Sequence, residues 1–95
     1  MNPNTSTKTT EQQQEAIRAE KQVALEEYRT RETQLHDGYQ RNLQDIQRRF
    51  ERNEITFKEQ QHAYSQAVIA FEEARTALYK DCMAVFEAIK QEILT

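Results

Sequence analysis

The chain has 95 residues, of which 37% are hydrophobic and 31% are charged, with a single glycine and a single proline. This composition favours one helical domain and excludes a sheet-based fold, because apolar residues do not alternate and hairpin-turn dipeptides are missing. The formal net charge of -3, with acidic and basic residues interspersed, argues against binding to nucleic acid or to an anionic membrane surface.

The first segment of the chain, residues 1–9, is polar apart from its initial methionine, and we expect a disordered tail. We interpret residues 10–95 as a single helical domain. No signal peptide and no apolar run of membrane-spanning length is visible, so we expect a cytoplasmic protein without a membrane partner. Export by a machine that needs no signal peptide is the alternative.

The first helix is predicted over about residues 11–52, with Thr10 and Gln13 forming a capping box at its start. Its apolar stripe advances in steps of seven and four, and consists of Ile17, Ala24, Tyr28, Leu35, Tyr39, Ile46 and Phe50. An eleven-residue repeat has about 3.67 residues per turn, so the helix should run nearly straight. Gly38 keeps this register, and we interpret it as a weak point inside one helix; a break there is the alternative.

Residues 53–56 are predicted to form the turn. Asn53 tolerates the left-handed conformation that ends a helix, and Thr56 with Glu59 forms a second capping box. A second helix then covers about residues 57–94. The two helices would be about 60 Å and about 57 Å long. The matched lengths predict an all-α fold, a two-helix antiparallel hairpin of coiled-coil-like character.

The second helix carries two adjacent stripes of apolar residues. The small stripe is Ala63, Ala67, Ala70, Ala74, Ala77, Ala84 and Ala88, and the large stripe is Tyr64, Val68, Phe71, Leu78, Cys82, Val85 and Ile89. Pairing about the turn places Leu35 opposite Ala74, Tyr39 opposite Ala70, and Ile46 opposite Ala63. We therefore expect the small stripe to close the hairpin and the large stripe to be left over.

The surplus of apolar residues is greatest near the C-terminal end of the second helix, where one opposing helix cannot cover them. We predict a noncatalytic protein-protein interaction module that self-associates, two hairpins forming a four-helix bundle, and that acts as a small adaptor, chaperone or inhibitor. A heterologous helical protein is the alternative partner. The predicted interface residues are Tyr64, Val68, Phe71, Leu78, Tyr79, Cys82, Met83, Val85, Phe86, Ile89 and Ile93.

A metal site is the main alternative function. Glu59 and His62 have the Glu-x-x-His spacing of di-iron helical bundles, and in this respect the chain resembles encapsulated ferritin-like proteins, which are two-helix chains that dimerise around metal. The resemblance implies a further glutamate from the first helix at the same level. The turn-centred register instead places Phe50 and several arginines there, so we expect no metal and no cofactor.

Other kinds of site have weaker support. Arg41, Arg48, Arg49 and Arg52 could form a basic patch, but Asp45, Glu51 and Glu54 can pair with them, which favours a solvated face over nucleic-acid binding. Cys82 has the phase of a core residue, and no basic residue is fixed beside it. No phosphate loop, nucleophile elbow or zinc-ligand cluster is present, so we expect no enzyme activity. In general character the chain is similar to helical-hairpin chaperones of type III secretion and to small phage-encoded inhibitors.

Overall fold

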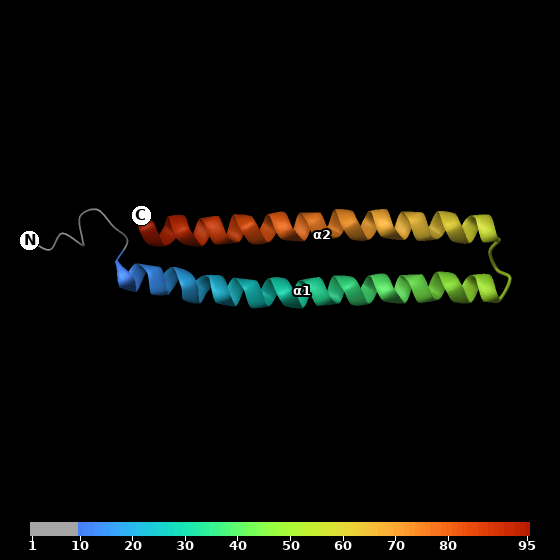
Figure 1. Cartoon of the computed structure of the whole chain (residues 1–95), viewed down its shortest axis with the longest axis horizontal. Helices are drawn as coiled ribbons and strands as arrows, with labels where there is room; N and C mark the ends of the chain where they lie inside the picture. Colours follow the sequence, from blue (N-terminus) through green and yellow to red (C-terminus); the bar gives the residue numbers. More distant parts are fainter. Residues whose placement is uncertain (1–9) are drawn as a thin grey trace, which may run out of the picture. The chain divides into compact units, whose positions relative to one another are not determined.

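The computed structural model describes residues 10–95, and every regular element in that range is an α-helix. The helices α1 (Glu11–Glu51) and α2 (Phe57–Leu94) pack against each other as a hairpin (Figure 1). The predicted all-helical hairpin is therefore confirmed, whereas its assembly into a four-helix bundle stays a prediction. The predicted disorder of residues 1–9 lies outside the described residues.

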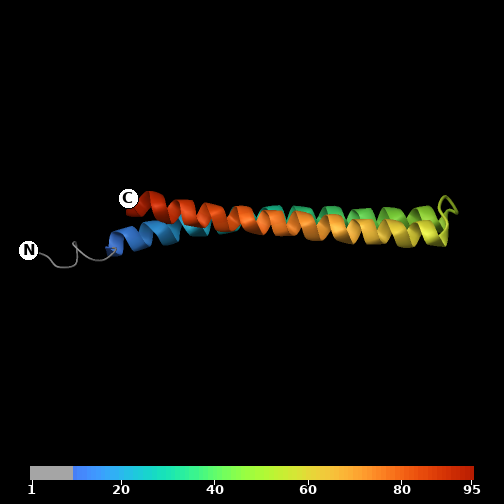
Figure 2. The same cartoon turned by 90° about the horizontal axis from the view of Figure 1, so that it is seen from above.

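The hairpin divides into two compact units. The turn unit is Thr30–Leu78, and the terminal unit combines residues 10–29 with residues 79–95. In each unit a segment of α1 lies beside a segment of α2 (Figure 2).

The start of α1 has the capping box that the sequence predicts. The backbone N–H of Gln13 donates to Oγ1 of Thr10 at 3.1 Å, and the backbone N–H of Thr10 donates to Oε1 of Gln13 at 2.9 Å. Two backbone donors that the helix itself cannot satisfy are paired in this way. The beginning of the helix is thus fixed by local chemistry.

The turn between the helices follows from one left-handed residue. Asn53 has a φ of 60°, a conformation that asparagine tolerates better than other residues with a side chain. The N–H of Glu54 donates to the carbonyl of Arg49 at 2.9 Å, and the N–H of Asn53 donates to the carbonyl of Phe50 at 3.0 Å. This pair of bonds is a Schellman motif, and it ends α1 at Glu51, one residue before the predicted end.

The start of α2 is a reciprocal capping box. The N–H of Glu59 donates to Oγ1 of Thr56 at 3.1 Å, and the N–H of Thr56 donates to Oε1 of Glu59 at 2.9 Å. The capping role predicted for Thr56 and Glu59 is confirmed. Because the Schellman motif and this box occupy consecutive residues, the chain reverses direction within a few residues.

The eleven-residue stripe of α1 faces α2. Ile46 is buried, with 6% of its surface exposed, and the other members of the predicted stripe are all half-buried. The helix continues through Gly38 without a break. A Cβ atom built on Gly38 would meet nothing within 4 Å, so no close contact at this position requires a glycine.

The packed face of α2 differs from the predicted one. Its buried or half-buried members are Gln60, Ala63, Tyr64, Ala67, Phe71, Ala74, Leu78, Cys82, Phe86, Ile89 and Ile93. The expectation that the small stripe closes the hairpin is met at Ala63, Ala67 and Ala74, but Ala70, Ala77, Ala84 and Ala88 are exposed. The expectation was wrong there because a heptad stripe drifts about 20° per heptad around a straight helix. Large residues such as Cys82 and Ile89 occupy the packed face instead.

Candidate protein-interaction surface

A polar triad joins the two helices near the turn. Gln60 is 5% exposed, and its Nε2 donates to Oε1 of Gln47 at 3.0 Å and to the hydroxyl of Tyr64 at 3.3 Å. The Tyr64 hydroxyl in turn donates to Oε1 of Gln47 at 2.9 Å. These bonds satisfy the buried amide, and they fix the register of α2 against α1.

Aromatic contacts support the same register further along the turn unit. The rings of Tyr39 and Phe71 are stacked, with centroids 4.4 Å apart, and the ring of His36 meets Phe71 edge-on at 5.7 Å. The guanidinium of Arg75 lies 5.9 Å from the Phe71 ring centroid. The Phe71 ring therefore makes several of its contacts within the chain, and His36 packs against it as an aromatic side chain.

Large apolar side chains are nevertheless exposed in the turn unit. Phe57 is 65% exposed, Ile69 49% and Val68 43%. By contrast, the buried apolar residues in this unit are Ile46, Ala67 and Leu78. The two helices thus leave substantial apolar surface in contact with water.

The terminal unit also exposes apolar side chains on α2. These are Tyr79, Met83, Val85 and Leu94, and the exposed Val23 of α1 belongs to the same unit. Phe86 is half-buried, with Nζ of Lys21 lying 5.7 Å from its ring centroid. No residue of this unit is among the buried apolar residues of the described chain.

The predicted interface residues fall into three groups by exposure. Val68, Tyr79, Met83 and Val85 are exposed, whereas Tyr64, Phe71, Cys82, Phe86, Ile89 and Ile93 are half-buried. Leu78 is 6% exposed in the lone chain, so its side chain is already used inside the hairpin. The exposed members are the ones that a partner could reach without opening the hairpin.

The predicted interface did not include four exposed apolar residues of the described chain, namely Val23, Phe57, Ile69 and Leu94. A signal for Phe57 was present, because Phe57, Val68 and Tyr79 stand eleven residues apart and so share one side of α2. The prediction grouped the residues of α2 into heptad stripes, and that grouping does not reveal the eleven-residue repeat.

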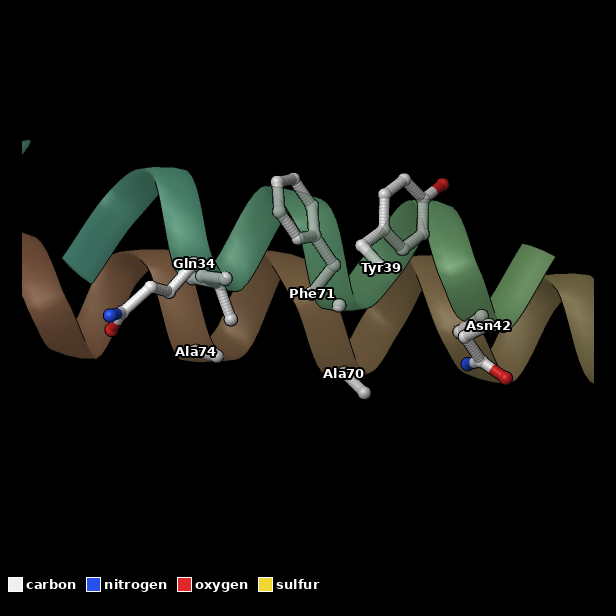
Figure 3. Close-up of a pocket in the computed structure, with 9 residues that line it drawn as sticks. Gln34, Tyr39, Asn42, Ala70, Phe71 and Ala74 are labelled. Atoms are coloured by element: carbon white, nitrogen blue, oxygen red, sulfur yellow. The ribbon is translucent and has the colours of Figure 1, made fainter. Parts of the chain in front are cut away.

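A surface hollow of about 390 Å³ lies in the turn unit. The stacked rings of Tyr39 and Phe71 stand together, while the methyl groups of Ala70 and Ala74 point away from them (Figure 3). Leu35 and Gly38 also line this hollow. Leu35 and Ala74 thus lie at the same level of the hairpin, as do Tyr39 and Ala70. Tyr39, however, stacks on Phe71 of the large stripe, and Ala70 is exposed, so the predicted packing of Tyr39 on Ala70 is wrong.

A second hollow, of about 480 Å³, lies beside the turn and contains the proposed metal pair. Glu59 and His62 line it together with Arg49 and Lys58, and Ile46 and Ala63 belong to the same lining. Within residues 10–95 no group of three or more His, Cys, Asp or Glu side chains could hold a metal ion. The cationic neighbours disfavour a divalent metal.

The predicted pairing of basic and acidic side chains on α1 is present at one position. Nε of Arg49 lies 3.1 Å from Oδ2 of Asp45, and both side chains are exposed. Such a pair contributes little to stability. It does reduce the positive charge that Arg49 could offer to a phosphate.

The hydrogen bonds of the capping box lower the pKa of Glu59 below its ordinary value of 4.5, the backbone N–H of Thr56 contributing most and its hydroxyl next. A lowered pKa means that the charged carboxylate stabilises the folded state above pH 4.5, and that this stabilisation is lost as the pH falls through the lowered pKa. The cap is therefore the acid-sensitive part of the turn.

Replacing Thr56 by alanine should lower the free energy of unfolding at neutral pH by about 1 kcal/mol, because the cap is lost. The pKa of Glu59 should rise toward 4.5, and the stability difference from the wild type should shrink in acid. Carboxyl NMR titration and thermal melts measure both effects. Thr33→Ala, at an exposed position within α1, is the control and should leave the Glu59 pKa unchanged. An identical Glu59 titration in wild type and Thr56→Ala would contradict the capping role.

Comparison of the chain with protein-family models, with curated proteins and with solved structures found no match. Neither helix in the described part of the chain has an apolar stretch long enough to cross a bilayer. Any function has to be inferred from the exposed surface of the hairpin itself.

Proposed function

We propose that this chain is a noncatalytic protein-binding module, that its first partner is a second copy of itself bound through α2, and that the assembly serves as a small adaptor, chaperone or inhibitor of another protein. The observation that carries the proposal is the exposure of large apolar side chains on α2, among them Tyr79 at 56%, Met83 at 47% and Val68 at 43%. Apolar patches of this kind on soluble proteins usually mark an interaction site.

The packing of the two helices leaves room for a partner. The buried apolar residues of the described chain are Ile46, Ala67 and Leu78. Within residues 10–95 no large side chain is fully buried, so the hairpin has much to gain from association.

The side chains that could perform chemistry are better explained as structural. The His36 ring packs against Phe71, and the Tyr64 hydroxyl belongs to the triad with Gln47 and Gln60. Cys82 is half-buried on the packed face of α2. A binding role uses the exposed apolar residues without requiring any of these groups to react.

The proposal is tested by the mass of the full chain in solution. Sedimentation equilibrium from low micromolar to several hundred micromolar should give a dimer that dissociates on dilution. Tyr79→Asp should weaken the dimer by about 2 kcal/mol, since a charge then replaces an aromatic anchor in the contact.

Gln66→Asp is the matched control, because Gln66 is also an exposed residue of α2 but lies about 140° around the helix from Tyr79. It should leave the mass unchanged, and both variants should keep the helical circular dichroism spectrum of the wild type. A wild-type monomer at every concentration would overturn self-association, and equal masses for Tyr79→Asp and wild type would move the contact away from α2.

A further inference from the structure

One side of α2 carries a mixed apolar and charged strip, which we call the outer strip and define as Phe57, Val68, Glu72, Arg75, Tyr79 and Met83. All six belong to a single continuous helix, so their spacing follows from helix geometry alone. At 100° per residue, Val68, Glu72, Arg75 and Tyr79 fall within a sector of about 60°. All four residues are exposed.

The outer strip is complementary to a second copy of itself that runs in the opposite direction. Reversal about the midpoint between Glu73 and Ala74 exchanges Glu72 with Arg75 and Val68 with Tyr79. The same operation exchanges Phe57 with Lys90, which would place a cation on an aromatic ring. At the centre of the strip an acid thus meets a base, and an apolar residue meets an apolar residue on either side of them.

The two central charges are available for such a contact. Nη2 of Arg75 lies 3.6 Å from Oε2 of Glu72 in the same helix, and these side chains are 54% and 55% exposed. A pair at that distance and exposure is weak. Each group keeps donors or acceptors free for a second ion pair with another molecule.

We infer that two copies of the chain associate through their outer strips, with the two α2 helices antiparallel and a two-fold axis passing between Glu73 and Ala74. Glu72 of each copy then pairs with Arg75 of the other, and Val68 packs on Tyr79 at both ends of that central cluster. The inference rests on the proposed function, which requires self-association but does not specify its geometry. A symmetric contact of this kind is isologous and closes at two copies.

The central charges select this arrangement over another. If the two-fold axis ran along the helices instead, two contacting α2 helices would run parallel, and Glu72 of one copy would not meet Arg75 of the other. Like charges facing each other would also disfavour a parallel α2 pair, because Glu72 would approach Glu72 of the other copy. Only the antiparallel pairing makes both ion pairs at once.

Charge reversal in two separate full-length variants tests the geometry. Glu72→Arg should raise the dimer dissociation constant about ten-fold, because two arginines then face two arginines, and Arg75→Glu should do the same with glutamates. An equimolar mixture of the two variants should form a heterodimer close to wild-type affinity, since every contact again pairs opposite charges. Sedimentation with one variant carrying a mass tag detects the mixed species.

The mixture separates the inferred contact from the pair within one helix. The ion pair between Glu72 and Arg75 of one chain is lost in both variants, and mixing does not restore it, so recovery on mixing can arise only between chains. Glu73→Arg, at an exposed neighbouring position on another side of α2, is the control and should leave the dissociation constant unchanged.

The possible results are distinct. If the wild type is a dimer but the mixture is no tighter than either variant alone, the antiparallel strip contact is overturned while self-association stands. If the wild type is a monomer at every concentration, both the inference and the self-association of the proposed function fail.

Discussion

Replacing Leu78 by aspartate is expected to unfold the hairpin. Leu78 is 6% exposed, and the variant would both remove a buried apolar side chain and place an unpaired carboxylate in its position. The combined loss should be about 5 kcal/mol, which is comparable with the whole stability of a small domain. Far-ultraviolet circular dichroism during thermal unfolding measures this result.

The matched control for Leu78→Asp is Thr76→Asp, which introduces the same charge two residues earlier at an exposed position. It should change the free energy of unfolding by less than about 0.5 kcal/mol. Similar melting curves for the two variants would show that Leu78 is not part of a packed core. Leu78→Ala, expected to cost about 3 kcal/mol, separates loss of packing from burial of charge.

The second large effect is expected for Gln60→Glu, a change that keeps the shape of the side chain but removes its donor group. Nε2 of Gln60 is replaced by a carboxylate oxygen that faces Oε1 of Gln47, an acceptor now 3.0 Å away. The Tyr64 hydroxyl can donate to the new carboxylate only by giving up its bond to Oε1 of Gln47. One buried acceptor therefore stays unpaired, and the change should cost about 3 kcal/mol at neutral pH. Chemical denaturation at neutral and at acid pH measures the loss.

Rotation of the Gln47 amide cannot relieve this conflict without a further loss, because Nε2 of Gln47 donates to Oε1 of Glu51 at 3.0 Å. In acid the new carboxyl becomes protonated and can donate again, so the deficit should shrink as the pH falls. Gln61→Glu is the control, since Gln61 is the exposed neighbour of Gln60, and its stability should match the wild type. If Gln60→Glu were as stable as Gln61→Glu, the result would contradict the stabilising role of the triad.

The polar triad could not be predicted from the sequence. Gln60 lies thirteen residues from Gln47, and glutamine on a helix is ordinarily a solvated residue. Only the packing of α2 against α1 brings the amide of Gln60 to Gln47 and makes it a buried group that has to be paired. The register therefore depends on a contact that no local pattern reveals.

The candidate surface was predicted in part. The sequence indicated that α2 has more apolar residues than one helix can cover, and Val68, Tyr79, Met83 and Val85 are indeed exposed. The sequence did not distinguish these exposed residues from the buried Leu78, because all of them belong to neighbouring positions on the same helix. The packed face drifts around α2 by a few degrees per turn, and this drift decides which of these side chains α1 covers.

The sequence by itself determined the helices and their ends, since capping boxes, the left-handed Asn53 and the eleven-residue repeat of α1 act over a few residues of the chain. The tertiary structure decided which side of α2 is packed. Burial on that helix depends on how its repeat drifts around the neighbouring helix, so Cys82 and Ile89 lie on the packed face where alanines were expected, and the outer strip is left exposed.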